Sequence, residues 1–384
     1  MASGEPISVQ FLKSVKGRGA VSNLQGRHEA NAREMFHDGW DVGDDGGQAI
    51  IVTKTTVIEE QAKSILSRNV SPDIPFGISM NPYRGCEHGC IYCFARPTHS
   101  YLGLSPGLDF ESKIFAKMNA PALLRAELAK PSYVPEPIAL GMNTDAYQPC
   151  ERKLGLTRRI LEVMQDCGQP VALITKSSLI ERDIDILAAM AAKRQAAAAI
   201  TITTLDPVLA RTLEPRAATP ARRLRTIREL TDAGIPVGVS IAPVIPFITE
   251  PELERVLEAV AEAGAVSASY IVLRLPWEVN PLFQQWLQAH YPERAARVMN
   301  RIREMRGGKD YDANFGTRMR GEGVWAQMLR QRFEKAASRL GLFGRGKRFG
   351  KLDCSQFMRP AGLPGQRASK PQRLGRAGAQ FELF

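Results

Sequence analysis

Three of the six cysteines stand close together in the stretch NPYRGCEHGCIYCF. Cys86, Cys90 and Cys93 have the spacing Cys-x3-Cys-x2-Cys, so one short loop offers three thiolates to a single centre. Thiolates are the usual ligands of iron–sulfur clusters, and three of them would leave one iron of a four-iron cluster open to another molecule. A structural zinc site is the alternative, and it would need a fourth ligand that His88 or His99 could supply.

Five short apolar runs between Pro137 and Pro276 alternate with helical segments and would position this loop. Ala, Val, Ile and Leu fill each run almost continuously, which is typical of strands buried on both faces of a parallel sheet. Capping signals delimit the helices, such as Thr219-Pro220 before one of them and Gly234 after it. Each unit takes roughly 30 residues, the size of a βα repeat. The runs are 138–142, 171–175, 198–203, 237–241 and 270–273.

A sixth strand is expected at 77–81, which places the cysteine loop at the carboxyl end of a strand. Six βα units are fewer than a closed eight-fold barrel needs, so we expect an α/β fold with an open, partial six-fold barrel and its chemistry at the carboxyl ends of the strands. Residues 1–71 are too polar and Gly-rich to form another unit. The expected organisation is an N-terminal extension (1–71), a core (72–312), and a C-terminal helix and basic tail (313–384), with the flanks covering the open side of the barrel.

Composition places the protein in the cytoplasm. No apolar run of 18 residues occurs, and the N-terminus has no apolar signal core, so we expect no membrane segment. Thiols stay reduced in the cytoplasm, which favours metal-binding or catalytic cysteines over disulfides.

The positive charge is concentrated near the C-terminus. The chain carries a net charge of +11, and residues 341–384 hold nine basic and two acidic side chains. A basic tail rich in Gly and Pro suits a polyanion such as nucleic acid. A solvated tail that only aids solubility is the alternative. Arg84 and Arg96, which flank the cysteine loop, could contact a substrate phosphate or have a structural role.

With these elements the sequence resembles the radical S-adenosylmethionine (radical SAM) enzymes over about residues 72–312. Their signature is a Cys-x3-Cys-x2-Cys loop after the first strand of a six-fold βα barrel, with an aromatic residue before the last cysteine. Tyr92 has that position here. The resemblance implies a 4Fe–4S cluster on Cys86, Cys90 and Cys93 whose open iron chelates S-adenosylmethionine, and reductive cleavage of that cofactor to a 5′-deoxyadenosyl radical. It also implies an electron donor such as flavodoxin or ferredoxin.

Further motifs are similar to those of proteins grouped with spore photoproduct lyase. Within this group, the sequence most resembles an uncharacterised bacterial branch. This group is described as DNA-repair-photolyase-like, so the resemblance implies lyase or repair chemistry. The motifs are TDAYQPCE, TKSS, TITTLD, LEPRAATPARR, APVIP and LRLP.

Polar residues at the ends of the second and third strands are candidates for cofactor binding. Oxygens of Asn143, Thr144 and Asp145 can accept hydrogen bonds from an ammonium group held over the cluster. The point charge of Lys176 can meet the cofactor carboxylate.

The next two strands end in further candidates. Hydroxyls of Thr203 and Thr204 would reach the cofactor carboxylate or ribose, and the backbone around Pro243 in APVIP can lie along the adenosine. For any one of these residues, an ordinary polar cap at a strand end is the alternative.

One departure from the family pattern concerns the hydrogen-atom donor. The resemblance implies a donor cysteine three residues before the aspartate of the second strand, but Met142 stands there, and a thioether has no S–H. Cys150, five residues after Asp145, is the candidate substitute, with packing as a small apolar side chain as the alternative. Thymine-dimer reversal by the lyase's own mechanism is therefore not the leading substrate assignment.

The favoured function is a radical SAM enzyme that acts on nucleic acid, in repair or modification. A radical SAM enzyme acting on a peptide or small molecule is one alternative, and a non-catalytic iron–sulfur or zinc protein that binds nucleic acid is another. Cleavage of S-adenosylmethionine distinguishes the last class from the first two. Salt-dependent binding to DNA or RNA distinguishes the first class from the second.

Overall fold

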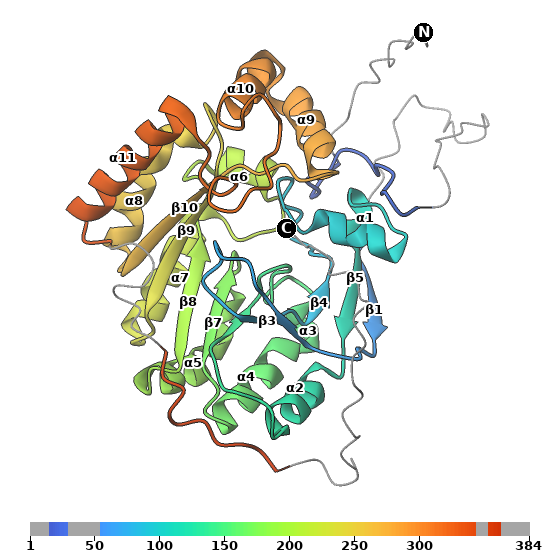
Figure 1. The fold of residues 1–384 in the computed structure, drawn as a ribbon, viewed down its shortest axis with the longest axis vertical. Coiled ribbons are helices and arrows are strands. Elements are labelled where there is room, and N and C mark those ends of the chain that lie inside the picture. The colour runs from blue at the N-terminus through green and yellow to red at the C-terminus, as the bar shows by residue number, and fades with distance from the viewer. Residues whose placement is uncertain (1–14, 30–53, 343–351, 362–384) are drawn as a thin grey trace.

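The structure, a computed structural model, describes residues 15–29, 54–342 and 352–361. Its centre is an open sheet of seven strands in the order β10-β9-β8-β7-β6-β3-β2 (Figure 1). Six strands run parallel, and β2 at one edge pairs antiparallel with β3. The expected open α/β barrel of six parallel strands is confirmed. The strands are β2 (Leu66–Arg68), β3 (Ile78–Met80), β6 (Ile138–Leu140), β7 (Val171–Thr175), β8 (Ala196–Thr201), β9 (Val237–Val244) and β10 (Ser267–Val272).

The apolar runs form the strands that the sequence predicts, with shifted ends. β7 has the predicted bounds, whereas β8 begins at Ala196 because that residue pairs with Val171 of β7. β9 continues to Val244, so Pro243 lies inside the strand and not in a turn after it. The strands β8 and β9 are almost wholly buried, as expected for the centre of a sheet covered on both faces.

Helices connect the strands and pack their apolar sides on the outer face of the sheet (Figure 1). The Thr219 hydroxyl caps α7 by accepting from the Arg222 N–H (3.4 Å), and Gly234 follows the helix with φ of 79°, as predicted. Ile227 and Leu230 of α7 are fully buried against the sheet, a burial worth about 1.5–3 kcal/mol for each side chain. The longer connecting helices are α2 (Ala120–Ala129), α4 (Leu156–Asp166), α5 (Ile184–Ala192), α7 (Pro220–Asp232) and α8 (Leu253–Glu262).

A second, small sheet lies beside the first, in the order β1-β5-β4. β1 (Thr56–Glu60) is parallel to β5 (Lys113–Lys117), and β4 (Tyr83–Arg84) is antiparallel to β5. β1 and β2 belong to residues 1–71, the segment expected to be an N-terminal extension. Each of them pairs with a strand from the part of the chain after this segment.

The C-terminal region adds helices and a docked segment. α9 (Val279–His290) and α10 (Pro292–Glu304) lie at the end of the barrel where β10 ends, and α11 (Gly323–Arg339) packs beside α8, close to the helix predicted at 324–340 (Figure 1). None of the helices in residues 54–342 is long and apolar enough to cross a bilayer.

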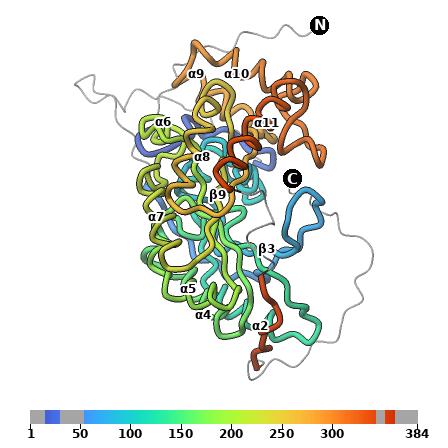
Figure 2. Tube along the Cα trace, turned by 90° about the vertical axis from the view of Figure 1, so that its left-hand side faces the viewer, coloured from blue at the N-terminus to red at the C-terminus, as the bar shows by residue number. Residues whose placement is uncertain are grey.

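Residues 352–361, named here the C-terminal strap, run across the amino-terminal end of the barrel beside α2 (Figure 2). The Asp353 N–H donates to the Arg194 carbonyl and the Met358 N–H to the Cys167 carbonyl, both at 2.8 Å. The Arg359 guanidinium donates to backbone carbonyls, including that of Tyr133 (3.3 Å). This part of the predicted basic tail is thus docked on the core, whereas 343–351 and 362–384 lie outside the described residues.

Candidate active site

The cysteine loop follows β4 and is folded back on itself. Cys86 and Cys90 are buried and Cys93 is half-buried. Gly89 has φ of 67°, and a Cβ there would come within 2.7 Å of the Glu111 carboxylate, so the tight turn needs glycine. The Cys86 N–H donates to the Phe110 carbonyl (2.9 Å), which ties the start of the loop to α1 (Leu108–Ser112).

The donor set fits a cluster better than a single ion. In the described residues, no three His, Cys, Asp or Glu side chains converge closely enough to hold one metal ion. A cubane cluster does not require that convergence, because each thiolate binds a different iron. The two histidines have other partners: His88 Nδ1 lies 3.2 Å from Asp145, and His99 Nε2 lies 3.0 Å from the Lys113 carbonyl. Burial raises the pKa of the Cys90 thiol to about 12, so a bound cation such as iron would be needed to ionise it.

A buried ion pair between Arg96 and Glu111 stabilises the cysteine loop. Arg96 begins the 3-10 helix η1 (Arg96–Leu102), and it pairs with Glu111, with both side chains 0% exposed. Arg96 therefore has the structural role and does not face a substrate, while Arg84 pairs with Glu60 at the surface (2.9 Å). The Arg96 guanidinium also donates to four carbonyls, those of Gly89 (3.1 Å), Cys90 (2.9 Å), Pro106 (3.0 Å) and Gly107 (3.0 Å).

Residues 15–29, named here the N-terminal clasp, lie over the same loop. The Gly19 and Ala20 N–H groups donate to the Glu111 carboxylate at 3.0 and 2.9 Å, and Arg18 donates to the Glu111 carbonyl at 2.6 Å. Gly19 packs so closely that a Cβ on it would overlap the carbonyl oxygen of Gly89. The described part of the N-terminal flank thus covers the cysteine loop.

Tyr92 belongs to a buried polar network. The Tyr92 hydroxyl and the Thr203 hydroxyl (2.6 Å) both donate to Glu214, which is also paired with Arg223. Burial alone would raise the pKa of Glu214, but the charges of Arg223 and Lys176 lower it to about 2, so this carboxylate is ionised. Thr203 thus donates its hydroxyl hydrogen to Glu214, and its role toward a cofactor stays a prediction.

Lys176 is the cation that this network leaves available. Its Nζ lies 5.8 Å from the centre of the Tyr92 ring, and no carboxylate of the described residues lies within ion-pair distance of it. Burial lowers the pKa of Lys176, but interactions with Cys90 and Glu214 outweigh this effect and raise the pKa above its ordinary value. The amine therefore stays charged. Lys176 can therefore meet an anionic group placed over the cysteine loop.

Asp145 joins three loops instead of facing the cavity. Its carboxylate accepts from the Thr175 hydroxyl (2.7 Å), from the N–H groups of Tyr147 and Lys176 (2.8 Å each), and lies 3.2 Å from His88. Burial would raise the pKa of Asp145, but the neighbouring His88 and the hydrogen bonds from Lys176 and Thr175 lower it to about 2. With its acceptor positions occupied, Asp145 positions the ends of β6 and β7.

Other residues predicted at the site also have partners of their own. Thr144 donates to the Tyr83 carbonyl (3.2 Å), and Thr204 donates to Glu252. The Pro243 carbonyl accepts from the Thr249 hydroxyl (3.2 Å). Asn143, in contrast, lines a cavity next to the cysteine loop.

Cys150 is half-buried in a small apolar cluster. Its side chain packs against the cluster formed by Tyr83, Ile114, Ala116 and Leu156, and its N–H donates to Glu87 (2.6 Å). This surrounding favours the packing alternative, and a donor role for Cys150 stays a prediction.

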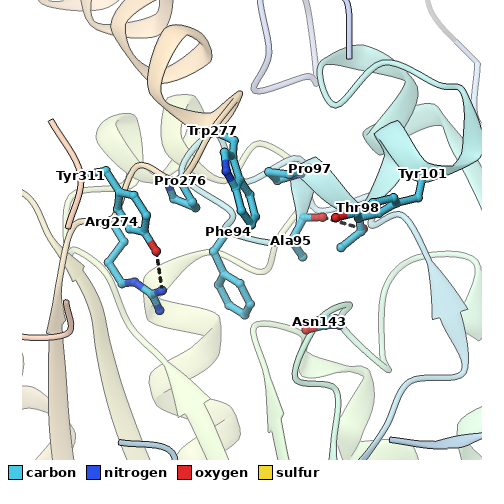
Figure 3. Close-up of a pocket in the computed structure, with 10 residues that line it drawn as sticks. All are labelled: Phe94, Ala95, Pro97, Thr98, Tyr101, Asn143, Arg274, Pro276, Trp277 and Tyr311. Carbon is cyan, nitrogen blue, oxygen red and sulfur yellow. Dashed lines mark hydrogen bonds between the residues drawn. The ribbon is translucent and has the colours of Figure 1, made fainter. Parts of the chain in front are cut away.

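A small cavity of about 20 Å³ lies beside the cysteine loop (Figure 3). Phe94 directly follows Cys93, so this cavity adjoins the loop that would hold a cluster. Sequence reasoning did not single out the side chains after β10, because LRLP does not show that its arginine is buried. The lining residues used below are Phe94, Tyr101, Asn143, Arg274, Trp277 and Tyr311.

Comparisons with known proteins agree with this geometry. The family model described as the radical SAM superfamily matches residues 80–260. An uncharacterized protein of Mycobacterium tuberculosis is 38% identical over 234 residues, which cover 60% of this chain and 68% of the relative. An uncharacterized protein of Methanocaldococcus jannaschii is 25% identical over 249 residues, which cover 65% and 89%.

Solved structures of spore photoproduct lyase have the same fold. A complex with dinucleoside spore photoproduct aligns with a TM-score of 0.53 and 14% identity, covering 76% of this chain and 82% of the lyase. A lyase variant with bound AdoMet and the same dinucleoside has a TM-score of 0.53 and 14% identity over the same shares. At this identity the likeness concerns the fold.

Proposed function

This chain belongs to the radical SAM superfamily, whose members use a 4Fe–4S cluster and S-adenosylmethionine, and on that premise we propose that it is an enzyme acting on nucleic acid, in repair or modification. The observation that carries the enzymatic part is the buried loop of Cys86, Cys90 and Cys93 with the charged Lys176 beside it. Bound there, the cluster and S-adenosylmethionine supply a 5′-deoxyadenosyl radical through one-electron reductive cleavage.

The residues of this chain hold and orient these groups. Cys86, Cys90 and Cys93 are the cluster ligands, and Lys176 pairs with the cofactor carboxylate. Asn143, at the end of β6, faces the cavity with its amide and is the candidate acceptor for the cofactor ammonium group. Tyr92, held by the ionised Glu214, shields the loop from water on the barrel side.

The surface around the cavity supports nucleic acid as the substrate class. Phe94, Tyr101 and Trp277 are each more than a third exposed, although large aromatic residues are usually buried. The Arg27 guanidinium lies 4.2 Å above the Trp277 ring. Exposed aromatic rings with arginines beside them are the stacking platforms that single-stranded nucleic acids bind. The basic residues beyond the C-terminal strap would add a sequence-independent attraction for phosphates.

The test of the enzymatic part is iron binding and cofactor cleavage. Anaerobically reconstituted protein should hold about four irons and, with dithionite, should convert S-adenosylmethionine to 5′-deoxyadenosine. Cys90→Ala should abolish both properties, whereas Cys167→Ala, at a buried cysteine outside the loop, should retain both. Stoichiometric zinc without iron in the anaerobic protein would contradict the proposal.

The substrate class has its own test. Binding to single-stranded DNA or RNA should weaken as salt rises, because phosphate contacts release counterions. Absent or salt-independent binding, together with normal cleavage of the cofactor, would leave a radical SAM enzyme that acts on a peptide or small molecule.

A further inference from the structure

Arg274 is a buried cation without an anion. It lies two residues after β10 and is 9% exposed. Its Nε has no hydrogen-bond partner, one Nη donates to the Tyr311 hydroxyl at 3.3 Å, and the other Nη lies 3.4 Å from the Met319 sulfur (Figure 3). Among the residues that the structure describes, no carboxylate lies within ion-pair distance of it. A buried charge with only a phenol and a thioether as partners is costly unless a ligand completes it.

Buried arginines with a structural role in this chain have different surroundings. Arg96, Arg223 and Arg306 each donate to at least two backbone carbonyls, and the first two also pair with a buried glutamate. Arg274 donates to no carbonyl in the described chain. Arg274 thus lacks the backbone partners that fix the other three arginines, and its Nε is left without any partner.

The charges near Arg274 compensate its positive charge only in part. The charge of Arg274 helps to lower the pKa of Asp73, but both oxygens of Asp73 are bound by Arg318, at 2.6 and 2.7 Å. Burial and the charge of Arg274 lower the pKa of Arg306 to about 10. An anion beside Arg274 would relieve this repulsion.

Building on the proposed function, we propose that Arg274 binds a phosphate of the substrate, and that the unstacked base of the same nucleotide packs on the exposed rings of Phe94 and Trp277. The planar guanidinium fits two oxygens of a phosphate, and the free Nε and an Nη lie on one edge of it. Enzymes that modify a base within a strand must first take it out of the stack. The neighbouring aromatic rings favour a nucleotide over an aliphatic carboxylate.

The test uses full-length, anaerobically reconstituted protein with S-adenosylmethionine present. Fluorescence anisotropy measures binding of a labelled single-stranded thymidine pentanucleotide and of its methylphosphonate counterpart, which has the same bases and uncharged linkages. The variants are Arg274→Met, Arg274→Lys and the control Arg228→Met, which removes one exposed charge on the outer helix α7.

We expect Arg274→Met to bind the phosphodiester roughly 10- to 100-fold more weakly, as for a lost hydrogen-bonded charge, and to bind the methylphosphonate as the wild type does. Its salt slope should fall by about 0.7, the contribution of one phosphate on a single strand. Arg274→Lys should be intermediate and should still prefer the charged strand. Arg228→Met should bind like the wild type.

The contrary outcomes are distinct. If Arg274→Met binds both strands like the wild type, the phosphate role of Arg274 is refuted while the nucleic-acid function survives. If the wild type binds neither strand, the proposed substrate class fails, and the phosphate assignment fails with it. The unfolding temperature gives a separate readout: removing an unpaired buried charge should leave it unchanged or raise it. A fall of about 4 °C or more, which is over 1 kcal/mol for a domain of this size, would show that Arg274 is structural and overturn the proposal.

Discussion

Glu111→Gln should detach the N-terminal clasp from the cysteine loop. The Glu111 carboxylate accepts from Gly19 and Ala20 on one side and pairs with Arg96 on the other, without contact with water. Glutamine has nearly the same shape but only one acceptor oxygen, so at least one of these donors would face an amide N–H₂. Arg96 would also lose its counter-charge in the interior. Removing one partner of a buried pair costs about 3–5 kcal/mol, a large part of a total stability of about 5–15 kcal/mol.

The measurement compares free energies of unfolding in urea with iron content after anaerobic reconstitution. The matched control is Glu304→Gln, because Glu304 pairs with Arg301 at the surface (2.9 Å), where such a pair is worth about 0–1 kcal/mol. Glu111→Gln should lower both stability and iron per chain, and the control should lower neither. If the two variants unfold within about 1 kcal/mol of each other and bind equal iron, the Arg96–Glu111 pair does not position the loop.

Three further predictions concern the cofactor, pH and the chain's end. Lys176→Met should weaken S-adenosylmethionine binding roughly 10- to 100-fold with unchanged iron content, and Lys176→Arg should bind the cofactor with an intermediate affinity. If Lys176→Met binds S-adenosylmethionine as tightly as the wild type does, Lys176 does not contact the cofactor carboxylate. Burial lowers the pKa of His99 from 6.5 to about 4, so the folded protein binds the His99 proton more weakly than the unfolded chain does. The free energy of unfolding should therefore be unaffected by His99 above pH 6.5 and should fall by up to about 3 kcal/mol as the pH drops towards 4. Unfolding measured as a function of pH should show this loss in the wild type and not in His99→Phe. Deleting 362–384 should flatten the salt dependence of nucleic-acid binding and leave the unfolding temperature unchanged. Deleting 345–384 should also lower the unfolding temperature because the C-terminal strap is lost. Equal slopes of affinity against salt for the full-length and shortened proteins would reject the role of the tail.

The parts of the fold set by local pattern could be predicted from the sequence. The buried strands β3 and β6 to β10 are continuous apolar runs, and the α7 cap is a local signal. β1 and β2 were missed because their side chains are largely exposed and their pairing partners lie far along the chain. Periodicity carries no information on such edge strands.

The candidate site likewise combines features that local sequence determines with features that tertiary packing determines. The spacing of the cysteines is a local property, and their approach in one loop follows from it. Thr203 and Thr204 are neighbours with the same side chain, yet one donates to Glu214 and the other to Glu252. Which hydroxyl faces which carboxylate depends on tertiary packing. The burial of Arg96 with Glu111 is equally invisible in the sequence, because charged residues are seldom fully buried.

The N-terminal clasp also bears on the order in which the protein matures. Gly19 and Ala20 leave the ribosome early, but Glu111, the residue that they bind, is synthesised about ninety positions later. Closing so long a loop has an entropic cost that is recovered only when its contacts form, so the clasp seats after the cysteine loop and α1 are in place. Iron–sulfur delivery to a nascent chain would meet an accessible cysteine loop, whereas delivery to the finished protein would meet a covered one.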